Sequence, residues 1–311
     1  MPDENDITNN PWIMSTQVAL GKNSFCDKRQ SYVKLAPPPK YFSEEFLIKN
    51  FSSLPTDVPT ILHGLESPAH GGLICTDQEA LNKQKGVLGH VMKQLAINLM
   101  KGLTISHISL PIKIFEPKSS IQRIVDMWAQ APVYLRQAAD IQDPLERFKN
   151  VIASMISSIY LCCGQNKPFN PLLGETLQGN YPDGTKFYCE HTSHHPPISN
   201  FLVEDVQDKF TLSGYYEVCG KMGTNSLTSG LRGPNNLIFA DGHHIRFGYP
   251  SYKLGGMVMG DRTIEAHGCC IFEDLTYNRK CVIIMNTFKK TGWIRSSSSG
   301  SKDAIIGSIY Q

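Results

Sequence analysis

The sequence lacks the features that mark membrane-spanning, secreted and nucleic-acid-binding proteins. It contains no run of about 18 apolar residues, so we expect no membrane-spanning helix. Its first residues, Met-Pro-Asp-Glu-Asn-Asp, are polar and acidic and do not resemble a secretory signal peptide. The 30 Lys and Arg residues nearly balance the 28 Asp and Glu residues, for a formal net charge of +2. We therefore expect no nucleic-acid partner, because such proteins carry a basic stripe.

Motifs for disulfide frameworks, zinc sites and nucleotide binding are missing as well. The chain has nine cysteines, an odd number, and no Cys-x-x-Cys spacing. Two pairs are vicinal, Cys162-Cys163 and Cys269-Cys270. We predict reduced thiols in a cytoplasmic protein, because structural disulfides and zinc sites need other spacings. No glycine pattern of a nucleotide-binding loop is present.

The chain divides into an N-terminal arm and a main domain. With 41 % apolar residues it can bury a large core. Prolines and glycines repeatedly interrupt residues 1–85, which predicts an irregular arm that wraps on the main domain or binds a protein partner. The main domain is expected over residues 86–311. It opens at residues 86–103, where apolar residues recur at threes and fours and predict an amphipathic helix.

The main domain is predicted to contain helices followed by many strands. Ser119 and Gln122 fit a capping box, and Asp143-Pro144 fits a helix start, so helices are expected within residues 119–163. After Gly174, short β-type segments alternate with turn signals such as the one at residues 182–184. We predict a mainly β, α+β fold, with a large, nearly closed antiparallel barrel over residues 172–311. Closure removes exposed strand edges, and a large barrel can enclose a cavity.

Hydrogen-bonding side chains gather between residues 167 and 201, on turns stiffened by prolines. The polar residues of this region are Lys167, Asn170, Glu175, Glu190, His194 and His195. Lysine, asparagine and two imidazoles can all donate to one anion, and imidazole titrates near neutral pH. The sequence thus predicts a phosphate-binding rim.

Both histidines reach one ligand only if the chain bends between them. Side chains of adjacent strand residues point to opposite faces, so His194 and His195 would diverge on a regular strand. Pro196-Pro197 supplies the bend.

Metal binding and hydrolysis are the two alternative kinds of chemistry for this region. A metal site needs further ligands at suitable spacing, and those available are scattered: Cys189, Glu190, His191 and the distant His243-His244. A hydrolase needs an activated nucleophile, but Ser193 beside His194 lies in no Gly-x-Ser-x-Gly turn. We expect no metal, no cofactor and no catalytic residue.

Two motifs here resemble the signatures of the oxysterol-binding protein family. Ser-His-His-Pro-Pro at residues 193–197, preceded by Glu190, is similar to the family's fingerprint. The usual form has Glu-Gln-Val before the serine, where this chain has Glu190-His191-Thr192. Lys-Pro-Phe-Asn-Pro-Leu-Leu-Gly-Glu at residues 167–175 resembles the second signature. The order of two long motifs makes the resemblance specific.

The resemblance implies a barrel around a lipid tunnel. It implies that Lys167, Asn170, His194 and His195 bind a phosphoinositide headgroup. Glu175 and Glu190 would orient these donors by hydrogen bonds. Residues 86–103 would form a lid over the tunnel, with a surface helix packed on the core as the alternative. The lid and tunnel residues would be Leu88, Val91, Leu95, Leu110 and Ile112.

The resemblance runs from about Gly86 to the end of the sequence. Family members continue into a C-terminal subdomain with a Lys-x3-Glu-x3-Arg helix that completes the phosphate site. No such segment follows the barrel here, so we expect a C-terminally shortened domain without this part of the anion site.

These observations predict a lipid-binding protein without enzymatic activity. Its lipid ligand would be a sterol, phosphatidylinositol 4-phosphate or both. It would transfer the lipid between membranes by a non-vesicular route. We expect transient contact with a membrane surface as a peripheral protein. Residues 289–295, with basic residues around Trp293, fit such a contact or a plain hairpin tip. The alternative function is a structural or adaptor subunit that keeps the fold without transport.

Overall fold

The computed structural model describes residues 65–66, 72–87, 89–90, 93–94, 110–159, 164, 166–286, 289–291, 297–299, 302 and 304–311. The expected lid residues Leu88, Val91 and Leu95 lie outside this part of the chain, as do Trp293 and most of the predicted arm.

The described residues form one 13-stranded sheet in which all pairings are antiparallel. The strands are β1 (Leu65–Glu66), β2 (Leu73–Cys75), β5 (Thr176–Asn180), β6 (Lys186–His194), β7 (Pro197–Glu204), β8 (Phe210–Met222), β9 (Ser226–Arg232), β10 (Asn235–Phe239), β11 (His244–Phe247), β12 (Ser251–Gly255), β13 (Thr263–Asp274), β14 (Arg279–Met285) and β17 (Ile305–Tyr310). A parallel pair, β3 (Phe115–Ser119) with β4 (Lys167–Phe169), and a hairpin, β15 (Lys289–Thr291) with β16 (Ser297–Ser299), stand apart from it.

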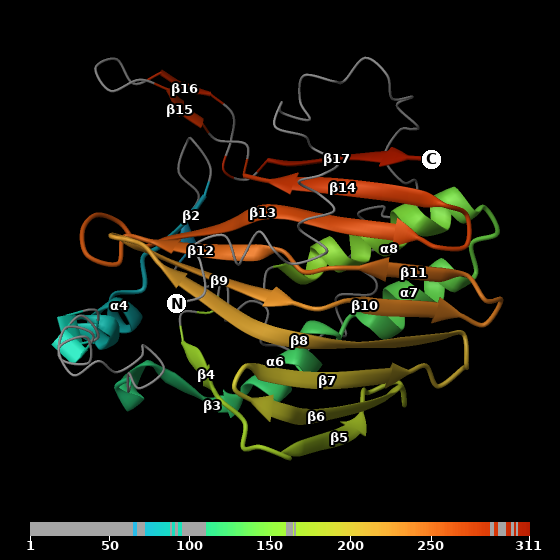
Figure 1. Cartoon of the computed structure of the whole chain (residues 1–311), viewed down its shortest axis with the longest axis horizontal. Helices are drawn as coiled ribbons and strands as arrows, with labels where there is room; N and C mark the ends of the chain where they lie inside the picture. Colours follow the sequence, from blue (N-terminus) through green and yellow to red (C-terminus); the bar gives the residue numbers. More distant parts are fainter. Residues whose placement is uncertain are drawn as a thin grey trace.

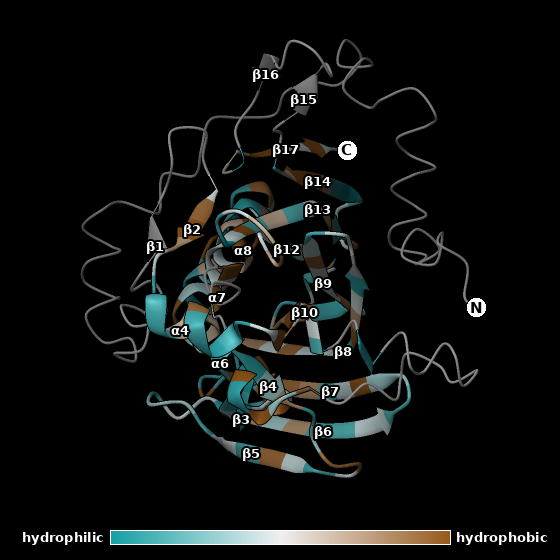
Figure 2. Cartoon of the chain, turned by 90° about the vertical axis from the view of Figure 1, so that its left-hand side faces the viewer, coloured by the Kyte–Doolittle hydropathy of each residue, from teal (hydrophilic) through white to brown (hydrophobic). Residues whose placement is uncertain are grey.

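The sheet forks between its two longest strands. The first half of β8 pairs with β10 and the second half with β9. In the same way, one end of β13 pairs with β11 and the other with β12. The sheet curves from β17 through β13 and β8 to β5 (Figure 2). The predicted mainly β architecture with a large, curved antiparallel sheet and helices before it is confirmed.

Three helices lie on the concave side of the sheet: α6 (Ser120–Met127), α7 (Ala131–Ala139) and α8 (Pro144–Ser157) (Figures 1 and 2). Both predicted helix starts are correct. The Gln122 side chain accepts a hydrogen bond from the Ser119 N–H at 2.7 Å, and Asp143 accepts from the N–H groups of Leu145 and Glu146 at 2.8 and 3.0 Å. The separate helix α7 was not predicted. Its N-cap residue, Gln130, makes no side-chain hydrogen bond to the helix, so the sequence contains no capping signal there.

An aromatic core joins the helices to the sheet. Trp128, at the end of α6, stacks on Phe201 of β7 with ring centroids 5.4 Å apart and meets Phe247 of β11 edge-on at 6.2 Å. Phe247 in turn stacks on Phe272 of β13 at 5.4 Å. Such contacts between large rings stabilise a core beyond the area they bury. They fix the helical layer against strands from both halves of the sheet.

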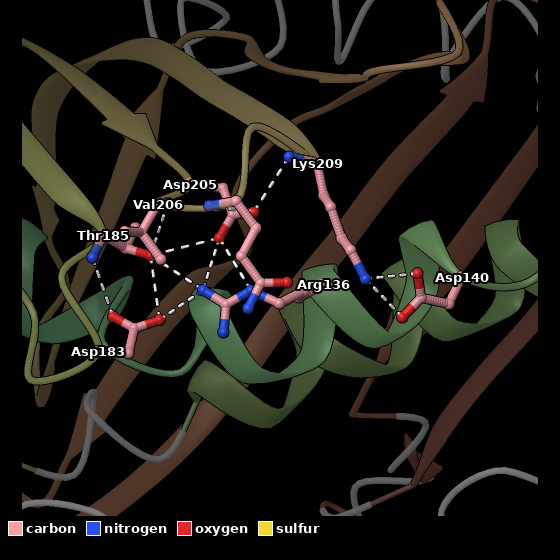
Figure 3. A network of polar contacts seen from close by, with 8 residues as sticks. Arg136, Asp140, Asp183, Thr185, Asp205, Val206 and Lys209 are labelled. Atoms are coloured by element: carbon pink, nitrogen blue, oxygen red, sulfur yellow. Dashed lines mark hydrogen bonds and ion pairs between the residues drawn. The ribbon is translucent and has the colours of Figure 1, made fainter.

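An arginine network ties α7 to two hairpin turns (Figure 3). One nitrogen of Arg136, Nη2, lies 2.5 Å from carboxylate oxygens of both Asp183 and Asp205 and 3.1 Å from the Thr185 hydroxyl. These partners sit in the β5–β6 and β7–β8 turns. Burial alone would raise the pKa of Asp183, but its bonds to Arg136 and Thr185 prevail and lower it. The far ends of four strands are thereby held on one helix.

The expectation of an irregular arm through residue 85 is wrong for its described end. Strand β2 pairs with β13, so it belongs to the sheet. Helix α4 (Gln78–Gln84) follows, and Asp77 caps it by accepting from two N–H groups at 3.0 Å. Strands β9 and β12 were also missed. Their sequences alternate weakly, and pairing with each other and with β8 and β13 specifies them.

Candidate functional site

The site begins with a lysine held against an aromatic ring. Lys167 opens β4, whose Phe169 ring stacks on Phe115 of β3 at 4.7 Å. The Lys167 ammonium lies 5.0 Å from the centre of the Phe115 ring. It donates to the Asn170 side-chain oxygen at 2.9 Å and to the Pro168 carbonyl at 3.1 Å. Burial lowers the pKa of Lys167. Its described partners are neutral, so an anion would be a stronger one.

A tight turn connects this lysine to the main sheet. Gly174 adopts φ +79°, a backbone conformation that favours glycine. The Gly174 N–H donates to the His191 carbonyl at 2.9 Å, and the His191 N–H donates to the Glu175 carbonyl at 2.9 Å. The Glu175 carboxylate accepts from the Leu172 N–H at 2.8 Å. Glu175 therefore orients the turn, whereas the sequence predicted that it orients the lysine or the histidines.

The two adjacent histidines lie in the hairpin between β6 and β7. Strand β6 ends at His194, which pairs with Pro197 at the start of β7, and the His195–Pro196 peptide bond is cis. The two imidazole rings meet edge to face with centroids 5.1 Å apart. The predicted bend at this histidine pair is confirmed.

A third histidine, which the sequence analysis considered only as a scattered metal ligand, lies behind the pair. His191 is 1 % exposed. Its Nδ1 lies 2.8 Å from the Ser199 hydroxyl, and its Nε2 lies 3.1 Å from Nδ1 of His194. Burial lowers the pKa of His191, and the neighbouring His194 lowers it further.

A register shift in β6 explains why these rings meet. On a regular strand, residues three apart point to opposite faces. Between His191 and Ser193 the pairing with β7 shifts by one residue, which leaves Thr192 as the extra residue of a bulge. His191 and His194 thus come to one side. The three-residue spacing of histidines next to Pro-Pro was the signal available in the sequence.

Four of the predicted residues form two directly contacting pairs, Lys167 with Asn170 and His194 with His195. The turn at residues 171–175 and the backbone of His191 link the pairs. Both views place β4 beside the end of β6 and β7 where the histidines lie (Figures 1 and 2).

Three other predicted residues make no hydrogen bond or ring contact with these pairs among the described contacts. Glu190 is exposed on β6 and makes no hydrogen bond to the four donors among the described contacts. Leu110 is half-buried. Ile112, in the short 3-10 helix η3 (Ile112–Ile114), is 71 % exposed. That Ile112 lines a tunnel stays a prediction.

Apolar side chains are exposed on the segments that present the lysine. Leu172 and Leu173, at the tip of the turn, are 76 % and 67 % exposed. Phe169 of β4 is 39 % exposed. Exposed apolar groups of this size mark contact surfaces when they gather beside polar groups.

Within the described ranges, no group of three or more His, Cys, Asp or Glu side chains is arranged to hold a metal ion. None of the described helices combines the length and apolar character needed to cross a bilayer.

Comparison with known proteins identifies relatives that share this sequence and fold. The chain is 35 % identical over 246 residues to oxysterol-binding protein 9 of Dictyostelium discoideum, which covers 78 % of this chain and 57 % of the relative. It is 32 % identical over 193 residues to oxysterol-binding protein-related protein 8 of Mus musculus, covering 60 % of this chain and 21 % of that protein.

Solved structures resemble the fold over a similar range. The Osh3 ORD of Saccharomyces cerevisiae, in complex with PI(4)P, matches with a TM-score of 0.55 and 27 % identity, over 66 % of this chain and 54 % of that one. The Osh1 ORD domain, in complex with ergosterol, matches with a TM-score of 0.53 and 28 % identity, over 58 % of this chain and 44 % of that one. The chain thus spans little more than half, or less, of each of these proteins. The oxysterol-binding protein family model matches residues 92–311. Because this match covers most of the sequence, the chain belongs to the oxysterol-binding protein family.

Proposed function

We propose that this chain binds a lipid, a sterol or phosphatidylinositol 4-phosphate, and transfers it between membranes. The similar solved domains hold ergosterol, cholesterol or PI(4)P, which supports this ligand class. One observation carries the headgroup part of the proposal. The turn at residues 171–175 is bonded to β6 at His191, and so holds the Lys167–Asn170 pair on the strand that ends in the histidine pair.

The donors of this site suit a phosphate monoester. Such a group carries close to two negative charges at neutral pH and three acceptor oxygens. The Lys167 ammonium would supply charge, and the Asn170 amide nitrogen can donate while its oxygen accepts from the lysine. The histidine rings add further N–H donors. Each hydrogen bond to a charged group contributes about 1.5 to 3 kcal/mol.

The proposal extends to how the protein meets a membrane. The exposed pair Leu172–Leu173 lies a few residues from Lys167, at the tip of the linking turn. Leucines beside a cationic group suit the boundary between lipid headgroups and acyl chains. We propose that this tip inserts at the bilayer surface and brings the donors next to the lipid headgroups. Residues 86–103 would act as the lid, and the contact would be transient and peripheral.

A sterol ligand depends on a different kind of energy. Burying about 300 to 400 Å² of its apolar surface at about 25 cal/mol/Å² is favourable by roughly 8 to 10 kcal/mol relative to water. The relatives and structures that match are named as lipid-binding proteins and not as enzymes. The alternative function as a structural adaptor receives no support from these comparisons.

The test is lipid pick-up from liposomes by the wild-type chain and by His194→Ala combined with His195→Ala. Phosphatidylinositol 4-phosphate pick-up is expected to fall about a hundredfold or more with two charge-assisted bonds lost, while sterol pick-up persists. The matched control is His244→Ala combined with His267→Ala, which removes two histidines of β11 and β13. Equal pick-up by wild type and the site variant would contradict the headgroup role.

A further inference from the structure

We propose that His191 is a positioning residue: it donates a hydrogen bond from Nε2 to His194 Nδ1 and so fixes the tautomer in which His194 presents its Nε2–H to an anion. The inference deepens the proposed function and rests on it for the identity of that anion, a phosphate monoester. The usual family pattern has glutamine at this position, so the arrangement belongs to this chain's own residues.

Two imidazole rings, those of His191 and His194, share one hydrogen bond. Nε2 of His191 lies 3.1 Å from Nδ1 of His194, which is hydrogen-bonding distance for two nitrogens. Only one hydrogen lies between them, so one ring donates and the other accepts. If His194 donates, its neutral ring has a bare Nε2 that repels an anion. If His191 donates, neutral His194 must carry its hydrogen on Nε2, where it can bind one.

In the proposed arrangement, Ser199 is the hydrogen-bond donor to His191. Its hydroxyl lies 2.8 Å from Nδ1 of His191, and it stands directly opposite His191 in the β6–β7 pairing. Both residues are 1 % exposed, so water does not compete for this bond. A hydroxyl can donate to Nδ1, and a neutral His191 then carries its hydrogen on Nε2. In this arrangement the hydrogen bonds run from Ser199 through His191 to His194.

The surroundings favour a neutral His191. Burial lowers its pKa, and the adjacent His194 lowers it further, whereas the carboxylate of Glu175 acts in the opposite direction. A neutral ring can accept from Ser199 and donate to His194 at once, which a doubly protonated ring cannot. Nε2 of His194 has no hydrogen-bond partner among the described residues and remains available to a ligand.

Glutamine provides the conservative variant. Its amide nitrogen can donate to His194 Nδ1 while its oxygen accepts from Ser199, so His191→Gln preserves both bonds without an ionisable group. Leucine at this position preserves bulk and removes both bonds. Ser199→Ala removes only the outer bond and leaves the His191 ring in place. Thr192→Val, on the same bulge, is the matched control.

The experiment is ¹⁵N NMR of histidine-labelled full chain at about pH 8, above the ordinary histidine pKa of about 6.5. In wild type we expect hydrogens on Nε2 of both His191 and His194, with a scalar coupling across the bond to His194 Nδ1. Thr192→Val should match wild type, and His191→Gln should keep the His194 hydrogen on Nε2. His191→Leu and Ser199→Ala should add the Nδ1–H form of His194. A wild-type hydrogen on His194 Nδ1, or no coupling, would overturn the proposal.

Affinity is measured in parallel with phosphatidylcholine vesicles that contain phosphatidylinositol 4-phosphate, and with inorganic phosphate. His191→Leu should weaken binding to the vesicles about fivefold, the worth of one neutral hydrogen bond, and His191→Gln should restore it to within about twofold. Failure of glutamine to rescue the loss would overturn the positioning role. If wild type binds neither vesicles nor phosphate while the NMR result holds, the proposed ligand is wrong and the hydrogen-bond relay stands.

Discussion

Cationic side chains have different partners at the two ends of strands β5 to β8. At one end, the Arg136 guanidinium is bonded to two carboxylates and a hydroxyl from the β5–β6 and β7–β8 turns (Figure 3). At the other end, the Lys167 ammonium is bonded to two neutral oxygens, and His194 and His195 contact each other. The same strands therefore run from a neutralised network to an open set of donors.

The difference separates polar groups with charged partners from those that we propose bind the ligand. A buried charge whose partners are satisfied stabilises the fold as long as all partners remain. A desolvated cation with only neutral partners retains most of its capacity to bind an anion. Asp205 is fully buried at the first end, whereas His195 is exposed at the second. We expect substitutions at the first end to change stability and those at the second to change binding.

The largest expected effect is on stability at the neutralised end. Arg136→Ala leaves the buried Asp205 without its cation, and we expect a loss of about 3 to 5 kcal/mol in the free energy of unfolding. Urea denaturation measures it. The control is Lys209→Ala, which breaks an exposed pair with Asp140 and should lower stability by less than about 1 kcal/mol. Equal effects of the two variants would remove the distinction drawn between the ends.

The next effect is on binding at the donor end. Lys167→Met keeps an apolar stem over the Phe115 ring but removes the ammonium. We expect affinity for phosphatidylinositol 4-phosphate in liposomes to fall about ten- to a hundredfold, the worth of one charge-assisted bond, with little change in stability. Lys186→Met, an exposed lysine at the start of β6, is the control. A large loss of stability with unchanged lipid affinity would make Lys167 structural.

A smaller effect is expected at the leucine tip. Leu172→Ser combined with Leu173→Ser removes apolar surface that is exposed in the free protein, so folding should be unaffected. Binding to phosphatidylcholine vesicles, measured by co-sedimentation, should weaken about tenfold. Val206→Ser, in the β7–β8 turn at the neutralised end, is the control because its side chain is 51 % exposed. A similar loss with the control would indicate general surface hydrophobicity.

The smallest effect concerns acid stability. Asp183 bonded to Arg136 has a folded-state pKa below its usual value of 3.8, so the carboxylate contributes stability that is present above that value. This contribution is lost as the pH falls through the folded-state pKa. Because Asp183 is partly exposed, we expect less than about 1 kcal/mol. Urea unfolding between about pH 5 and pH 3 should show a steeper decline for wild type than for Asp183→Asn. Parallel declines would argue against this pair as a source of acid sensitivity.

Much of the fold followed from local signals. The helix starts at Ser119 and Asp143 depend on side chains that bond neighbouring N–H groups, and a turn signal such as residues 182–184 marks a hairpin wherever it occurs. Helix α7 and strands β2, β9 and β12 escaped prediction because their local sequences carry weak periodicity. Pairing partners distant in the sequence specify these strands, as Leu73 opposite Ile264 shows.

The candidate site was also predictable from the sequence only in part. The motifs at residues 167–175 and 193–197 contain the proposed donors, because the residue types alone show which groups can donate to a phosphate. The bulge at Thr192 was not visible in the motif, although it turns His191 toward His194. The motif also did not show the hydrogen bond from the Leu172 N–H to the Glu175 carboxylate, which makes that carboxylate part of the turn.

By itself, the sequence indicated the family, a helical segment followed by many strands, the bend at the two prolines and the proposed donors for an anion. Only the tertiary structure decided which charges are neutralised, as at Arg136, and which donors have only neutral partners, as at Lys167. The physical reason is that hydrogen-bond geometry and burial depend on partners brought together by long-range strand pairing, whereas propensity and capping act within a few neighbouring residues.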